Sequence, residues 1–471
     1  MSSGIPAPSR WPDRVRDLFA MSQSGIRDVL LLLAPQAVMV LTAFLTTLLV
    51  ARGLGPAALG HYGLVLSVAG LAAAFSDMGI GQTAIRYAAR AAAEGRTAEQ
   101  MAVLRWALRL RIALVVVVAA VLAALAPLIA GRLWHAPELA PLIQMGLLGG
   151  VFTTLAAVPV VYFQSVRRFG RNATVQIGQA LLGLAGVLLV GALGRWSVSA
   201  LIAVSVVTAA LGALVFLVMV PRAALMPPRG EAGATQVRRP FWSSPIEPSP
   251  TLAGVTDGGP GAFAMYNMIS TIVVMVTLRL DVWLMGVFGR PEQVGLYTVA
   301  SRFALPLGLL LAAVGGALWP RASAHSDPRD ALVLLKRTFQ LSLPLGAAAV
   351  VYAVVVPLLT PWLFGSAYAG SRLLAQVLCV RYALAILIVP VGVIGYSLGL
   401  VRWYWIINLV QLVTVATINV VLLPRIGPMA AALALVVSEI VGVTLAGTLL
   451  LRRARQIARE PGHDDRAGVT A

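Results

Sequence analysis

Long apolar stretches separated by short polar gaps dominate this sequence. Twelve of them are long enough to cross a bilayer, which takes about 20 residues in a helix. They fall at residues 26–50, 59–78, 108–130, 139–163, 173–193, 197–220, 264–288, 293–318, 338–360, 371–399, 403–423 and 428–451. Lipid offers no partner for an unpaired backbone group, and the stretches lack the alternating polarity of barrel strands. The pattern therefore predicts an all-α polytopic membrane protein with twelve transmembrane helices.

A repeated turn indicates that the chain contains two copies of one unit. Residues Pro56–Tyr62, between the first two stretches, are echoed by Pro291–Tyr297, between the seventh and eighth. Each turn begins with proline, has glycine four residues later and ends on tyrosine. Duplicated bundles are a common plan for transporters. We therefore expect two six-helix lobes, at residues 26–220 and 263–452.

Three segments flank these lobes in the predicted organisation. Residues 1–25 have one apolar and one charged helical face, which is typical of an amphipathic segment lying on the cytoplasmic membrane surface. Residues 221–262 are rich in proline and glycine and are expected to form a cytoplasmic linker between the lobes. Residues 453–471 are expected to form a cytoplasmic tail.

The distribution of basic residues predicts the orientation in the membrane. The net charge is +18, and of the 36 lysines and arginines, 27 lie in the tails and every second gap, whereas the alternate gaps hold six. Cytoplasmic segments carry such an excess, so both termini are predicted to be cytoplasmic. The same distribution makes anionic lipid headgroups the expected partner of the basic surface and argues against nucleic acid.

Five ionisable side chains fall well inside predicted spans, all in the second repeat: Arg279, Asp281, Arg302, Arg381 and Glu439. Each would oppose insertion by roughly 2.5 to 3.5 kcal/mol if it faced lipid near the helix centre. They must therefore face protein or a hydrated cavity. Counted along their helices from the outer ends, all of them lie around the bilayer midplane, where they could form one layer.

Two interpretations of this layer remain open. In the first, Asp281 pairs with Arg302 and Glu439 pairs with Arg381, so that the charges neutralise one another. In the second, the three arginines exceed the two acids and bind an anionic headgroup such as a diphosphate, for which guanidinium is geometrically suited. Asp281 or Glu439 would then carry a coupling proton or sodium ion, and no other cofactor, catalytic residue or resident metal is expected.

Charges also lie at the predicted cytoplasmic edge of the membrane. Arg27, Asp77 and Arg86 are placed there, and either topology alone explains them or they line the cytoplasmic mouth of a substrate cavity. Residues 82–111 contain good helix formers and are predicted to form one cytoplasmic helix running into the third span.

Short motifs along nearly the whole chain, taken with their order and spacing, resemble bacterial polysaccharide-biosynthesis flippases. That family belongs to the multidrug/oligosaccharidyl-lipid/polysaccharide (MOP) superfamily. The segments that carry the resemblance are Ala51–Tyr62, Ser76–Gly79 with Arg86, Arg279–Asp281, Val294–Arg302, Phe364–Tyr368 and Gly427–Glu439.

The resemblance implies a function and a fold. A protein of this family would move an undecaprenyl-diphosphate-linked oligosaccharide, the repeat unit of an O-antigen or exopolysaccharide, across the bacterial inner membrane. It would do so by alternating access between the two lobes of a MATE-like bundle, around a cationic central cavity. Membrane lipids, a polysaccharide polymerase and a chain-length regulator are the expected partners.

Three alternatives compete with this function. A cation-coupled multidrug exporter of the same superfamily would have acids dominating its cavity, whereas three arginines lie near the midplane here. A lipid II flippase would more often have additional helices. A membrane polymerase or ligase would carry a large outer loop, and every outer gap here is short. The sequence therefore favours a transporter over an enzyme.

Overall fold

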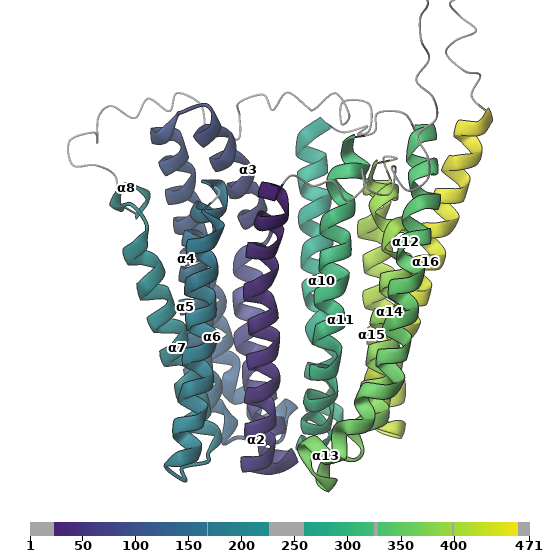
Figure 1. The fold of residues 1–471 in the computed structure, drawn as a ribbon. Helices are drawn as coiled ribbons and strands as arrows, with labels where there is room; N and C mark the ends of the chain where they lie inside the picture. Colours follow the sequence, from purple (N-terminus) through teal and green to yellow (C-terminus); the bar gives the residue numbers. More distant parts are fainter. Residues whose placement is uncertain (1–22, 167, 226–258, 325–327, 398–399, 460–471) are drawn as a thin grey trace, which may run out of the picture.

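The computed structural model describes residues 23–459 except residues 167, 226–258, 325–327 and 398–399. Within these residues the secondary structure is helical throughout (Figure 1). The first half contains α2 (Gln23–Asp77), α3 (Ile80–Ala93), α4 (Thr97–Leu128), the π-helical turn η1 (Ile129–Leu133), α5 (Leu139–Ser165), α6 (Phe169–Ala192), α7 (Val198–Met219) and α8 (Arg222–Leu225). The second contains α10 (Gly259–Phe288), α11 (Pro291–Ala324), α12 (Pro328–Val355), η3 (Val356–Leu359), α13 (Thr360–Phe364), η4 (Ser366–Tyr368), α14 (Ser371–Ser397), α15 (Val401–Ile426) and α16 (Pro428–Arg459).

Eleven helical segments in this part of the chain are long and apolar enough to cross a membrane. The first, Ala34–Asp77, has 44 residues and covers most of the first two predicted helices, 26–50 and 59–78. Its helix α2 breaks at Gly55, where φ is 79°, a conformation that glycine adopts without a steric penalty. Pro56 then starts the second arm, a position at which proline costs no helical hydrogen bond. The two arms run in opposite directions (Figure 1). The helical elements and the eleven candidate spans confirm the all-α polytopic class.

The helices form two groups with their ends aligned. Helices α2 to α7 lie on one side and α10 to α16 on the other, and α2 begins at the end of the bundle where α16 finishes (Figure 1). We call this the basic end, because the predicted basic gaps fall there. The other end, which holds the α2 break and α13, is called the outer end; that it faces outward stays a prediction.

The hydrophobic core is continuous between the two groups only toward the outer end. A single cluster there contains buried side chains from both: Leu59, Val65, Ile143, Ile202, Phe303, Leu378 and Leu435 are members. Toward the basic end the described residues form separate cores. One contains Leu104, Phe163 and Phe216, and the other contains Leu318, Ile394 and Leu450. The lobes are therefore packed together at the outer end and packed separately at the basic end.

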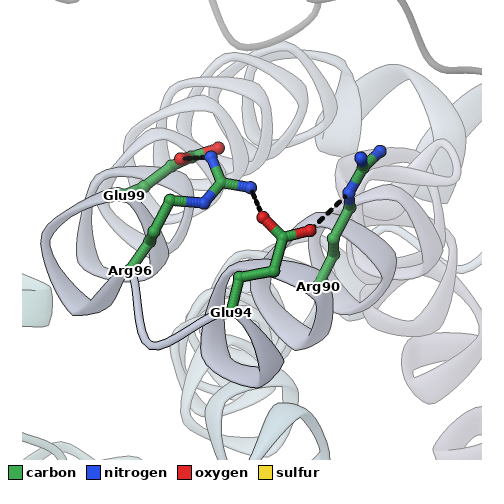
Figure 2. A network of polar contacts seen from close by, with 4 residues as sticks. All are labelled: Arg90, Glu94, Arg96 and Glu99. Carbon is green, nitrogen blue, oxygen red and sulfur yellow. Dashed lines mark hydrogen bonds and ion pairs between the residues drawn. The ribbon is translucent and has the colours of Figure 1, made fainter.

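A corner at the basic end corrects the prediction of one continuous helix over residues 82–111. The helix breaks between α3 and α4, where Gly95 has a φ of 71°. Side chains on both sides of the corner form an exposed network (Figure 2): Arg90, Glu94, Arg96 and Glu99. Exposed ion pairs stabilise a fold only weakly, by about 0 to 1 kcal/mol each. The break itself follows from the glycine, which tolerates the left-handed conformation.

The flanking segments are only partly described. The predicted amphipathic segment lies outside the described residues apart from positions 23–25, which belong to α2. In the predicted linker, Arg222–Leu225 forms α8 and Gly259 begins α10, while 226–258 lie outside the description. Helix α16 continues to Arg459, so the first part of the predicted tail is helical.

Candidate functional site

Arg279 reaches from the second lobe onto the first. It lies on α10, and its side chain is exposed although its position is inside a span. Its Nη2 atom is 3.0 Å from the point where a Cβ on Gly70 of α2 would lie. The missing side chain at Gly70 therefore leaves room for the guanidinium against the first lobe. Among the described residues, no carboxylate forms an ion pair with Arg279.

Arg302 supplies a second guanidinium at the same seam. It lies on α11, and its Nε atom is buried without a hydrogen-bond partner. Its charge is close enough to interact with Arg279 and with the Tyr62 hydroxyl of the first lobe. No described acid pairs with it. Two like charges without an acid beside them give this part of the seam a positive potential, which favours an anion over a cation.

Asp281 does not form the expected pair with Arg302. It is 5% exposed, and its carboxylate accepts hydrogen bonds from the Tyr297 hydroxyl and from the backbone N–H of Val282, the latter at 2.7 Å. Arg279 and Asp281 point in different directions, since the first is exposed and the second buried. The reason is helical geometry, because positions two apart lie about 200° apart around the axis.

Arg381 and Glu439 do form the expected pair. The Nε atom of Arg381 lies 3.5 Å from Oε2 of Glu439, and their side chains are 18% and 19% exposed. The guanidinium of Arg381 also lies 5.0 Å from the centre of the Tyr382 ring, a cation–π contact. Arg381 therefore has an acid beside it, in contrast to Arg279 and Arg302.

A cavity of about 310 Å³ lies in the second lobe, lined by residues of α11, α14, α15 and α16. Among the described residues that line it, Glu439 is the only carboxylate, and the polar groups beside it are Tyr404, Asn408 and Gln411. Arg279 and Arg302 do not line it. The Glu439 carboxylate and the two amide side chains offer the oxygen ligands that alkali and alkaline-earth cations prefer. The cavity and the arginine seam are thus separate sites.

The residues predicted at the cytoplasmic mouth have different outcomes. Asp77 forms an ion pair with Arg111 of α4, which is 5% exposed, and accepts the backbone N–H of Gly81 at 3.2 Å. These contacts hold the turn between α2 and α3 against α4. Arg27 lies in α2 and Arg86 in α3, but their side chains are outside the description. A role for all three at the mouth stays a prediction.

The repeated turns face each other at the outer end. A Cβ on Gly60 would overlap the carbonyl oxygen of Pro291, and a Cβ on Gly295 would overlap the carbonyl oxygen of Pro56. These residues occupy matching positions in the two turns, so each glycine of one lobe packs against the proline backbone of the other. We call the four residues the outer closure.

Hydrogen bonds between the lobes flank the outer closure. Arg52 donates from Nε to the Leu363 carbonyl at 2.8 Å, and the Tyr368 hydroxyl donates to the Ala51 carbonyl at 3.1 Å. Both join α2 to the α13–η4 corner of the second lobe. Together with the shared core, they close the seam at the outer end.

Sequence reasoning missed several of these residues. Tyr297, which holds Asp281, was visible as the tyrosine of the repeated turn, but the turn did not show what its hydroxyl contacts. Gly60 and Gly295 were likewise visible as the glycines of the repeated turn, but the turn did not show that they contact the other lobe. Nothing in the sequence distinguished Gly70, or showed that Arg111 is buried, because both depend on which helices pack together.

Comparisons with known proteins agree with this arrangement. The sequence model of the family described as polysaccharide biosynthesis protein matches residues 26–325, more than half of the chain. The chain belongs to this family. The match confirms the family resemblance found in the sequence. None of the curated proteins compared with the chain matches it.

Solved structures show which fold the family member has. A multidrug resistance MATE family transporter of the MOP superfamily, inward-facing, aligns with a TM-score of 0.63 at 14% identity, over 89% of this chain and 96% of its own. The lipid II flippase MurJ, in an inward closed conformation, aligns with a TM-score of 0.62 at 12% identity, over 90% and 89%. The MATE multidrug transporter DinF-BH, solved as a complex, gives 0.60 at 16% identity, over 94% and 96%. At these identities the likeness shows the fold, and the MOP fold class is confirmed.

Proposed function

We propose that this protein moves an undecaprenyl-diphosphate-linked oligosaccharide from the inner to the outer leaflet of the bacterial inner membrane. The observation that carries the proposal is the pair Arg279 and Arg302, which lie at the seam between the lobes without an acid partner. A diphosphate brings the anionic oxygens that guanidinium groups bind in bidentate geometry. The family assignment to polysaccharide biosynthesis supports a saccharide-bearing substrate.

The packing of the lobes suits loading from the basic end. The outer closure and the shared core hold the seam shut at the outer end, whereas the cores are separate at the basic end. The substrate would enter from the basic end and reach the two arginines. The lobes would then part at the outer closure and release it on the other side.

Substituting the two arginines tests the proposal. Each charge-assisted contact contributes about 1.5 to 3 kcal/mol, so Arg279→Ala or Arg302→Ala should weaken substrate affinity by roughly 10- to 150-fold. In cells, the lipid-linked glycan should accumulate in the inner leaflet while the variant protein remains inserted. Arg425→Ala is the matched control, because Arg425 is exposed near the outer end. Unimpaired export by both seam variants refutes the proposal.

We also propose that Glu439 binds the coupling Na⁺ or H⁺. Glu439 lines the cavity of the second lobe, whereas Asp281 is buried against Tyr297 and has less access to a hydrated space. Glu439→Gln removes the charge with little change in shape. In proteoliposomes, it should abolish the acceleration of transport by an imposed Na⁺ or pH gradient while leaving equilibrium binding of the lipid diphosphate intact. Retained acceleration contradicts the assignment.

The alternatives give different outcomes in the same assays. A multidrug exporter would move cationic dyes, which two partnerless arginines repel. A lipid II flippase would move lipid II in preference to a lipid-linked oligosaccharide.

A polysaccharide polymerase and a chain-length regulator in the same membrane are the proposed partners, and each should be recovered with this protein after mild crosslinking in cells.

A further inference from the structure

Two tryptophans meet at the seam between the lobes. Trp134 follows η1 in the first lobe, and Trp283 lies on α10 in the second. Their rings form an edge-to-face contact, with centroids 5.7 Å apart and an interplanar angle of 69°. The Nε1 atoms of both are buried and have no hydrogen-bond partner. Buried donors nearly always find an acceptor, so two adjacent exceptions call for an explanation.

An interfacial role facing lipid does not explain Trp134. Tryptophans near the ends of membrane helices often face the headgroups, and Trp362 at the outer end has the exposure that such a role requires, 77% of its surface. Trp134 is 6% exposed. Its Nε1 edge lies against Gly286 of α10, which has no Cβ to keep the indole away. The indole of the first lobe is thus inserted against a helix of the second.

The two indoles continue the arginine site toward the outer end. Trp283 is four residues from Arg279 on α10, one helical turn or about 6 Å along the axis, and on the same face. Arg279 lies over Gly70, and Gly286 lies beside Leu64, both on the second arm of α2. The seam between α10 and this arm therefore runs from a guanidinium to a pair of indoles.

We propose that Trp134 and Trp283 form a saccharide subsite, which takes the sugar attached to the diphosphate when the lobes part at the outer end. The inference rests on the proposed function, because the diphosphate at Arg279 sets where the sugar lies. Indole rings pack on the apolar faces of sugar rings, and indole N–H groups donate to sugar hydroxyls. A polyprenyl chain has no acceptor to offer, so it would leave both donors unpaired. In the closed seam the donors lack partners, and the substrate brings them.

Binding to two probes tests this subsite. The protein in lipid nanodiscs is titrated with undecaprenyl diphosphate and with the same lipid carrying one N-acetylglucosamine. The wild-type protein should bind the glycosylated lipid more tightly. Trp134→Phe and Trp283→Phe keep an aromatic ring but remove the N–H, and each should lower this preference by about 2- to 10-fold. Using the ratio of affinities removes any effect of a variant on the binding of the lipid diphosphate that both probes share.

Four further variants separate the outcomes. Trp362→Phe, at the exposed outer tryptophan, should leave the preference unchanged. Gly286→Ala should displace the Trp134 indole and lower the preference for the glycosylated lipid. This variant tests the subsite if a tryptophan variant fails to fold. Equal binding of both probes by the wild-type protein, or an unchanged preference in the variants, overturns the subsite. Arg279→Ala should weaken both probes alike, and if neither Arg279→Ala nor Arg302→Ala weakens them, the proposed function fails independently of the tryptophans.

Discussion

Adding one methyl group at Gly60 should open the outer end of the seam. In the structure, a Cβ on Gly60 would overlap the carbonyl oxygen of Pro291, and backbone atoms cannot rotate away as a side chain can. The lobes must therefore separate locally before the methyl group fits. Gly295→Ala makes the matching change against Pro56 and should have a similar effect.

The expected size of the effect comes from overpacking. Inserting a methyl group into a tightly packed contact costs about 1 to 3 kcal/mol, and here only the closed arrangement bears this cost. The gain in helix propensity from glycine to alanine, about 1 kcal/mol, applies to both arrangements and cancels. The equilibrium between closed and open should therefore shift by roughly 5- to 150-fold toward open.

Cysteine labelling measures this shift. The single native cysteine, Cys379, is fully buried and can be replaced by alanine. A reporter cysteine at Thr298 then lies in the seam, because the Thr298 Oγ1 atom is 2.9 Å from the Cβ position of Gly63. The rate of labelling by a membrane-impermeant maleimide added from the outer side should rise by the factor given above. Gly131→Ala is the matched control, since a Cβ there meets nothing within 4 Å.

A Gly60→Ala protein that is inserted normally and labels at the wild-type rate contradicts the prediction. A Gly131→Ala protein whose labelling rate rises as much as that of Gly60→Ala contradicts it as well. In either case, the close approach of the two turns would not hold the seam shut.

Three further predictions concern stability and pH. Asp77→Ala leaves the buried Arg111 without its acid and should lower the free energy of unfolding by about 3 kcal/mol. Arg111→Ala should cost less, because the Asp77 side chain is 36% exposed to solvent; thermal unfolding in detergent compares the two. Burial raises the pKa of Tyr368 to about 12. Its bond to Ala51 should therefore persist below a pH of about 10 and be lost only as the pH rises further. The labelling rate of the reporter, divided by that of an exposed cysteine that shares its dependence on the thiolate, should therefore be constant between about pH 6 and 9. Hydrogen bonds from Arg90 and Arg96 lower the pKa of Glu94. The ion pairs of the α3–α4 corner should therefore be fully present above the ordinary glutamate pKa of about 4.3 and be lost as the pH falls below it. Their loss should raise the amide exchange rate at residues 94–96.

Local chemistry explains most of what the sequence predicted about the fold. Apolar length alone identified the membrane helices, because no other secondary structure satisfies the backbone of a long apolar segment in lipid. The error over residues 82–111 came from weighing helix propensity above one glycine. Gly95 ends α3 because it adopts a positive φ at no steric cost.

The candidate site was only partly predictable. The pair of Arg381 with Glu439 follows from charge and depth in the membrane, and the structure contains it. Asp281 was paired with the wrong residue, because depth along a helix does not tell which neighbour its side chain faces. Tyr297 provides a neutral hydrogen-bond donor on α11, and this leaves Arg302 without an acid.

The sequence by itself determined that this protein is a helical membrane bundle, and it predicted two related halves with ionised side chains near the midplane of the second half. It also contained the two turns that form the outer closure. Only the tertiary structure decided that Gly60 and Gly295 pack against each other's turns, that Gly70 lies beneath Arg279, and that Trp134 lies against Gly286. Apolar length and charge act within one segment, whereas a missing Cβ matters only once another helix has approached it.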